Sequence, residues 1–148
     1  DYFFLDFEEF ENMRQSQQFL ECAKVYDNWY GVPKQEVREA LARGQDALIK
    51  LDVQGASTVK TLLPDALMIF LAPPSLEELE RRLRFRQSES VKALHLRLKA
   101  AKEEMQAIGL FDYKVINQNH RLDLAAFCID SIITSEKCRF PPRKMKEF

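Results

Sequence analysis

Four polar side chains of this sequence have the chemistry to accept or donate hydrogen bonds at a ligand. Glu21 and Asp52 carry carboxylates, which accept hydrogen bonds from N–H groups, and Tyr2 and Tyr30 carry phenolic hydroxyls. Spacing alone does not make them a site, because an acid on a half-exposed strand is more often solvated. A tyrosine is often a rim residue of the core with a wet hydroxyl.

Three arginines form the second group with useful chemistry: Arg82, Arg86 and Arg97. Arginine suits the charge that develops on a phosphoryl group during its transfer. The competing interpretation is a solvated basic face on a long helix, screened by nearby acids at Glu77, Glu78 and Glu80. The arginines therefore need a positioned phosphate before they imply catalysis.

The glycines do not supply a loop that could cradle a triphosphate. Such a loop reads Gly-x-x-x-x-Gly-Lys-Ser/Thr, because glycines let backbone N–H groups close around phosphate oxygens. The four glycines are far apart in the sequence, and none precedes Lys-Ser or Lys-Thr: Gly31, Gly44, Gly55 and Gly109. The sequence also begins at Asp1 without Met, which we interpret as a trimmed chain or a fragment.

Composition and spacing exclude several other kinds of function. His95 and His120 have no Cys, Asp or Glu partner at a metal-ligand spacing, so we predict no metal site. The net charge of −1 argues against nucleic acid or membrane partners, and no apolar run has a spanning length. Three cysteines and no visible signal peptide favour a reducing compartment, the cytoplasm: Cys22, Cys128 and Cys138.

The hydrophobic pattern predicts the elements that must position these residues. We expect a helix capped by Asp6, with Glu9 completing an acidic capping box. Further helices are expected at 34–43, 53–63, from 76 onward, and at 91–108 and 122–133; strands are expected at 3–5, 19–25, 47–51, 66–71 and 113–116. From about residue 34, helices alternate with apolar strands, which predicts an α/β fold with a parallel sheet covered on both faces.

Several short motifs, taken in order, resemble guanylate kinase, the enzyme that transfers a phosphoryl group from ATP to GMP. They are Asp1-Tyr2-Phe3-Phe4, Phe19-Leu20-Glu21, Asn28-Trp29-Tyr30-Gly31, Leu51-Asp52-Val53-Gln54-Gly55, Phe70-Leu71-Ala72-Pro73-Pro74-Ser75, Arg82-Leu83, Arg97-Leu98 and Val115-Ile116-Asn117. The resemblance covers nearly the whole chain. It implies an incomplete P-loop kinase-type sheet and one domain, 1–148. That domain would comprise a small mixed α+β GMP-binding-like subdomain at 1–32, a core at 33–134 with a lid at about 84–96, and a loose basic tail at 135–148.

The resemblance also implies a role for each candidate residue. By family position, Glu21 would meet the guanine, Tyr2 and Tyr30 the 5′-phosphate, and Asp52 the same GMP pocket. The arginines would face the phosphates, with Arg86 and Arg97 as catalytic candidates and Arg82 and Arg86 in the lid. The family uses ATP and Mg²⁺.

The sequence departs from the family pattern in ways that weaken these roles. Val32 replaces a hydroxyl residue, and Lys50 replaces an acid near the magnesium, where a cation repels Mg²⁺. Phe85 and Gln87 replace lid glycines, which stiffens that segment. An Arg-rich stretch that clamps the GMP phosphate in the family has no counterpart in the sequence. We therefore expect neither ATP nor Mg²⁺ to bind well.

The missing phosphate loop has a structural and a functional consequence. In the family, the strand that leads into this loop lies between the strands predicted at 47–51 and 66–71. Its loss would leave buried backbone groups unpaired at roughly 1–3 kcal/mol each. Three outcomes are open. The two neighbouring strands pair directly, another chain inserts a strand between them, or the natural gene product has more N-terminal sequence. We expect the 148 residues to be inactive in phosphoryl transfer while keeping part of the GMP pocket. The alternative is a non-catalytic guanylate kinase-like module that binds a protein or peptide.

Overall fold

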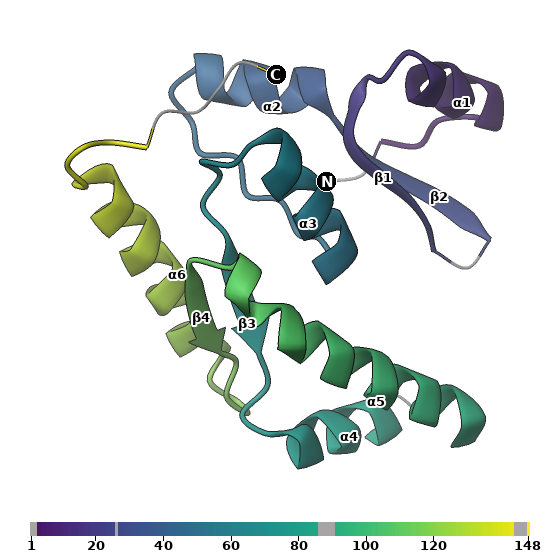
Figure 1. The fold of residues 1–148 in the computed structure, drawn as a ribbon, viewed down its shortest axis with the longest axis vertical. Helices are drawn as coiled ribbons and strands as arrows, with labels where there is room; N and C mark the ends of the chain where they lie inside the picture. The colour runs from purple at the N-terminus through teal and green to yellow at the C-terminus, as the bar shows by residue number, and fades with distance from the viewer. Residues whose placement is uncertain (1–2, 26, 86–90, 144–147) are drawn as a thin grey trace. The chain divides into compact units, whose positions relative to one another are not determined.

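The protein folds into two compact units that meet in sequence between Pro64 and Asp65. The structure is a computed structural model and describes residues 3–25, 27–85, 91–143 and 148 (Figure 1). Within the described residues, no helix has the length and apolar character needed to cross a membrane. Helix α3 packs on strand β1 and so belongs with the N-terminal elements.

The N-terminal unit is built on an antiparallel hairpin. Its elements are α1 (Phe7–Gln15), β1 (Phe19–Val25), β2 (Asn28–Pro33), α2 (Lys34–Ala42) and α3 (Val53–Leu62). The Asp6 carboxylate accepts a hydrogen bond of 2.8 Å from the Glu9 backbone N–H, which confirms the predicted cap of α1.

Helix α1 lies beside strand β1 (Figure 1), and an aromatic cluster packs it against one face of the hairpin. Phe10 of α1 stacks on Phe19 with ring centroids 4.7 Å apart, and its centroid lies 5.9 Å from that of Trp29. Gly31 makes room for this packing, since a Cβ there would lie 2.7 Å from the Phe19 ring. The opposite face of the hairpin is thereby left to α3.

Two predicted strands are absent from the described residues. Segments 3–5 and 47–51 have no regular secondary structure, and Leu48 is 80% exposed. The predictions were wrong because a strand needs a hydrogen-bonded neighbour, and the described pairings are only β1 with β2 and β3 with β4. Direct pairing of 47–51 with the next strand, one of the expected outcomes, does not occur there.

The C-terminal unit contains the parallel part of the fold. Its elements are β3 (Ile69–Ala72), α4 (Leu76–Phe85), α5 (Val91–Gln106), the 3₁₀ helix η1 (Ala107–Leu110), β4 (Tyr113–Ile116) and α6 (Leu122–Lys137). Strands β3 and β4 pair in parallel, α4 and α5 pack together, and α6 packs on β4 (Figure 1). The core of this unit is formed by the buried side chains Met68, Phe70, Ala72, Val115 and Ala125. A two-stranded parallel sheet with helices is the incomplete α/β class that the pattern predicted.

The segment after residue 135 is more ordered than the predicted loose tail. Helix α6 continues to Lys137, and Arg143 lies beyond it with a side chain that is 19% exposed. The Arg143 guanidinium donates a 2.5 Å hydrogen bond to Glu136 and pairs with Asp112 at 3.5 Å. The contacts of Arg143 with Glu136 and Asp112 hold the segment up to residue 143 on the C-terminal unit.

Candidate functional site

The first turn of α3 holds one of the predicted acids in place. Asp52 is the N-cap of α3, and its Oδ1 accepts a 2.7 Å hydrogen bond from the Gly55 backbone N–H. That N–H is one of the donors that a helix start leaves without a partner inside the helix. The cap therefore fixes the orientation of the Asp52 carboxylate.

Glu21 of β1 lies against the same turn. A Cβ built on Gly55 would lie 3.1 Å from Glu21 Cδ and 3.2 Å from its Cγ, so the Glu21 side chain packs on the glycine backbone. Burial raises the pKa of the Glu21 carboxyl, and the nearby negative charge of Asp52 raises that pKa further. The structure thus brings the partly desolvated Glu21 carboxylate close to the exposed carboxylate of Asp52, which is 31 positions away in the sequence.

The hairpin register adds two residues to the face that carries Glu21. Val32 is directly opposite Glu21, and Tyr30 is opposite Ala23 two residues further along the strand. Opposed residues of an antiparallel pair share a face, and so do residues two apart on one strand. Tyr30, which is 44% exposed, therefore shares a face with Glu21, and Val32 lies on that face directly across from Glu21.

The described residues do not offer a metal site at this pair. No group of three or more His, Cys, Asp and Glu side chains suited to a metal ion occurs in the described part of the chain. Asp52 Oδ1 is already engaged as the helix cap, and Lys50, two residues before it, is exposed. Carboxylates and substrate phosphates usually hold Mg²⁺ together, so the residues present do not fit that ion by themselves.

Arg82 of α4 makes a hydrogen-bonded tie to the loop after β4. Its Nη2 donates to the Asn117 carbonyl at 2.8 Å and to Asn119 Oδ1 at 2.5 Å, and its Nε donates to Glu78 at 2.8 Å. Hydrogen bonds from Arg81, then Asn119 and Arg82, lower the pKa of Glu78 to about 2. In this structure the Arg82 guanidinium therefore joins α4 to the 117–119 loop.

The remaining predicted residues are distributed as follows. Arg97 lies on α5 and is half-buried, whereas Tyr2 and Arg86 lie outside the described residues. Residues 86–90 of the predicted lid at 84–96 also lie outside them. Glu21, Tyr30 and Asp52 belong to the N-terminal unit, and Arg82 and Arg97 belong to the C-terminal unit.

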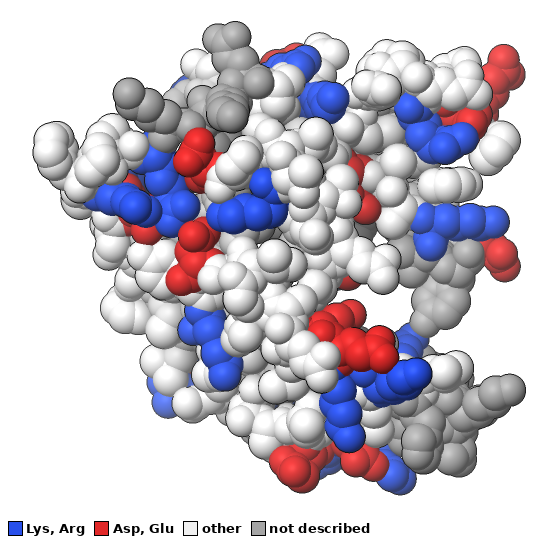
Figure 2. All heavy atoms as spheres, viewed as in Figure 1, with Lys and Arg blue, Asp and Glu red and all other residues white. Residues whose placement is uncertain are grey.

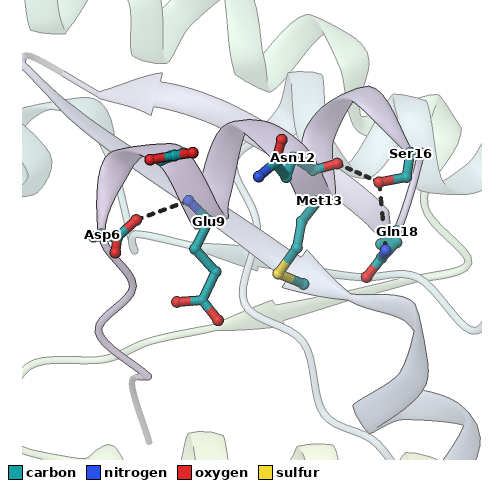
Figure 3. Close-up of a pocket in the computed structure, with 7 residues that line it drawn as sticks. Asp6, Glu9, Asn12, Met13, Ser16 and Gln18 are labelled. Atoms are coloured by element: carbon teal, nitrogen blue, oxygen red, sulfur yellow. Dashed lines mark hydrogen bonds between the residues drawn. The ribbon is translucent and has the colours of Figure 1, made fainter.

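A separate open hollow of about 350 Å³ lies beside α1, and Figure 3 shows its polar lining. Asp6 caps the helix, and the Ser16 hydroxyl donates to the Asn12 carbonyl, so these polar groups serve the two ends of α1. None of the predicted site residues that the structure describes lines it. The lining consists of Asp6, Glu8, Glu9, Asn12, Met13, Ser16 and Gln18.

Charges of both signs are mixed on the visible surface. Figure 2 shows Lys and Arg side chains close to Asp and Glu side chains rather than in separate regions. Helix α4 illustrates this, since Arg81 and Arg82 both pair with Glu78. On this face, the pattern gives no broad single-sign surface of the kind that attracts nucleic acid.

Sequence reasoning missed two contributors to these sites. Gly55 lies under Glu21, and Asn119 accepts two hydrogen bonds from Arg82. A signal for the first was present, because Asp52 and Gly55 have the three-residue spacing of a helix cap and the N–H it binds. Asn119 carried no comparable signal, since its partner is 37 residues away.

Comparisons with known proteins agree on one family. Residues 1–136 match the family model described as Guanylate kinase. The guanylate kinase of Caldanaerobacter subterraneus subsp. tengcongensis is 42% identical over 144 residues, which cover 97% of this chain and 69% of that protein. The guanylate kinase of Clostridioides difficile is 41% identical over 137 residues, covering 93% and 66%.

A solved structure gives the same result. The crystal structure of guanylate kinase from Anaplasma phagocytophilum matches with a TM-score of 0.72 and 31% identity, covering 94% of this chain and 66% of that one. The chain therefore spans about two thirds of the length of the relatives that it matches.

Proposed function

Because this chain belongs to the guanylate kinase family, we propose that its N-terminal unit provides the GMP-binding part of phosphoryl transfer from ATP to GMP. The observation that carries this proposal is the seating of Glu21 against Gly55, beside Asp52 and on the hairpin face shared with Tyr30. We further propose that the 148 residues alone do not catalyse the transfer.

Guanine offers hydrogen-bond donors, which two ionised carboxylates cannot supply to each other. Its N1–H and exocyclic amine are adjacent donors, and a carboxylate can accept from both. The pKa of Glu21 is raised by burial and by Asp52, so two N–H donors at the carboxylate would relieve part of that unfavourable environment. Tyr30, and Tyr2 by its family position, would contact the 5′-phosphate through their hydroxyls.

The ATP side of the reaction lacks its main binding element in this sequence. No Gly-x-x-x-x-Gly-Lys-Ser/Thr stretch occurs in the 148 residues, and positioning of the transferred phosphoryl group supplies much of the catalysis in this chemistry. In the family Mg²⁺ neutralises phosphate charge, but the described residues do not fit the ion, so no step of this proposal passes through it. Arg86 and Arg97 remain the proposed catalytic arginines for a complete site, and Arg82 and Arg86 the proposed lid arginines.

Calorimetry with GMP and coupled ADP release test the two halves of the proposal. We expect GMP to bind the 148-residue polypeptide weakly, Glu21→Ala to weaken that binding by about tenfold or more, and no ADP release above background. Unchanged GMP affinity in Glu21→Ala would refute the base-reading role. Conversion of GMP to GDP by the same polypeptide would refute the inactivity.

One observation favours the alternative of a non-catalytic module that binds a protein or peptide. Val32 directly opposes Glu21, so an apolar side chain lies where a hydroxyl would help to bind the base. A pull-down with immobilised polypeptide, competed with GMP, separates the two functions. A partner released by GMP supports a module on the inherited pocket, whereas micromolar GMP binding without any partner favours the enzyme lineage.

The cellular location is also part of the proposal. The three cysteines, Cys22, Cys128 and Cys138, are free thiols, as expected in a reducing compartment such as the cytoplasm.

A further inference from the structure

Gly55 occupies a position where its own backbone does not require glycine. It lies in the first turn of α3, and its φ is not in the left-handed region that favours glycine. Glycine inside a helix is less favourable than alanine, because its unfolded backbone has more freedom to lose. Something other than backbone conformation must therefore explain the missing side chain.

The space around Gly55 supplies that explanation. Gly55 is buried, and a Cβ there would lie 3.1 Å from Glu21 Cδ, 3.2 Å from Glu21 Cγ and 3.3 Å from Asp52 Oδ1. These separations are tighter than most real Cβ contacts, so an added methyl would move one or both acids by a few tenths of an ångström. The Gly55 N–H simultaneously holds Asp52 at 2.7 Å.

We propose that Gly55 is a positioning residue for the two acceptor carboxylates, those of Asp52 and Glu21. Its backbone N–H holds Asp52, and its lack of a side chain leaves the space that Glu21 occupies. This inference rests on the proposed GMP site, and it adds a determinant of base selectivity that does not itself touch the base. A displacement of a few tenths of an ångström is small for folding but large for a hydrogen-bonded carboxylate, because hydrogen-bond strength depends steeply on distance and angle.

The first test measures the contact without a ligand, through melting temperatures of four forms of the 148-residue chain: wild type, Gly55→Ala, Glu21→Ala and the double variant. Alanine is the better helix former, so Gly55→Ala should raise the melting temperature clearly when Glu21 is already alanine. When the Glu21 side chain is present, this gain should be smaller or absent. Equal gains in the two backgrounds would overturn the steric basis of the inference.

The second test measures base selectivity by calorimetry with GMP and IMP, since hypoxanthine lacks the exocyclic amine. We expect Gly55→Ala to weaken GMP binding by about tenfold and IMP binding less, a loss comparable to most of one charged hydrogen bond. The matched control is Gly109→Ala, because Gly109 has open space around the position of a Cβ. Gly109→Ala should leave the affinity for both nucleotides unchanged.

The outcomes separate the two proposals. If the wild-type chain shows no preference for GMP over IMP, the proposed base-reading role fails, and the melting temperatures still decide whether Gly55 positions Glu21. If the wild type prefers GMP and Gly55→Ala keeps that preference, the positioning role of Gly55 is wrong. If Gly55→Ala lowers the preference for GMP over IMP without lowering the melting temperature, the positioning role is supported. A purely structural role of Gly55 would not produce that combination.

Discussion

Two substitutions at Asp52 separate its capping role from its charge. Asp52→Ala removes the oxygen that accepts from the Gly55 N–H at 2.7 Å and leaves that donor of a buried residue without its partner. Asp52→Asn keeps an oxygen for the cap, since Asn and Asp cap helices about equally well, but removes the negative charge beside Glu21. Only Asp52→Ala should therefore lower the stability, whereas both variants remove the negative charge beside Glu21.

The expected magnitude follows from the single hydrogen bond that is lost. Loss of an N-cap costs about 1 kcal/mol, which for a chain of this size lowers the melting temperature by about 3 °C. Asp52→Asn should stay close to the wild type. In both variants the pKa of Glu21 should fall toward its ordinary value, because one of the two causes of its elevation is removed.

Hydrogen exchange of the Gly55 amide, followed by NMR alongside urea unfolding, gives the local readout. The Gly55 amide should exchange faster in Asp52→Ala and at the wild-type rate in Asp52→Asn. Equal protection of that amide in the two variants, together with equal unfolding midpoints, would refute the argument that the Asp52 cap stabilises the first turn of α3.

Three further predictions concern packing and pH. Phe10→Ala should destabilise the N-terminal unit by about 3 kcal/mol in urea titrations, because Phe10 is 9% exposed and stacks on Phe19; a change below half of that would contradict the packing argument. Hydrogen bonds from Arg143 and then Tyr113 lower the pKa of Glu136 to about 2, so its contribution to stability is present above about pH 4.5 and lost as the pH falls toward 2. Arg143→Met should reduce that acid-dependent loss in melting curves, and an unchanged pH profile would show that the ion pair is not significant. The effect of Glu21 on stability has the opposite pH dependence, because the pKa of Glu21 is raised: its contribution to stability falls as the pH rises above about 4.5. Glu21→Gln should remove this part of the pH dependence.

The local features of the fold were predictable because neighbouring residues determine them. The Asp6 cap and its hydrogen bond to Glu9 follow from a three-residue spacing, and the structure contains that bond. Strand β4 was predicted at its observed bounds, Tyr113–Ile116, since its apolar residues stand out from the flanking polar ones. The α/β class followed from the alternation of helices and apolar strands.

Features that need a distant partner were not predictable in the same way. Segment 47–51 has a strand-like composition but no strand neighbour in the described residues, and hydrogen-bonded pairing, rather than composition, makes a strand. The basic residues after 135 suggested a loose tail, whereas Arg143 is anchored by Glu136 and by Asp112, 31 residues earlier.

The amino-acid sequence by itself determined the family, the absence of a phosphate-cradling stretch in these 148 residues, and the identity of Glu21 and Asp52 as candidate acceptors. Only the tertiary structure decided that both acids lie against Gly55 and that Val32 lies across from Glu21. The physical reason is that residue types and short spacings are local, whereas strand register and the close approach of a strand to a helix depend on long-range packing.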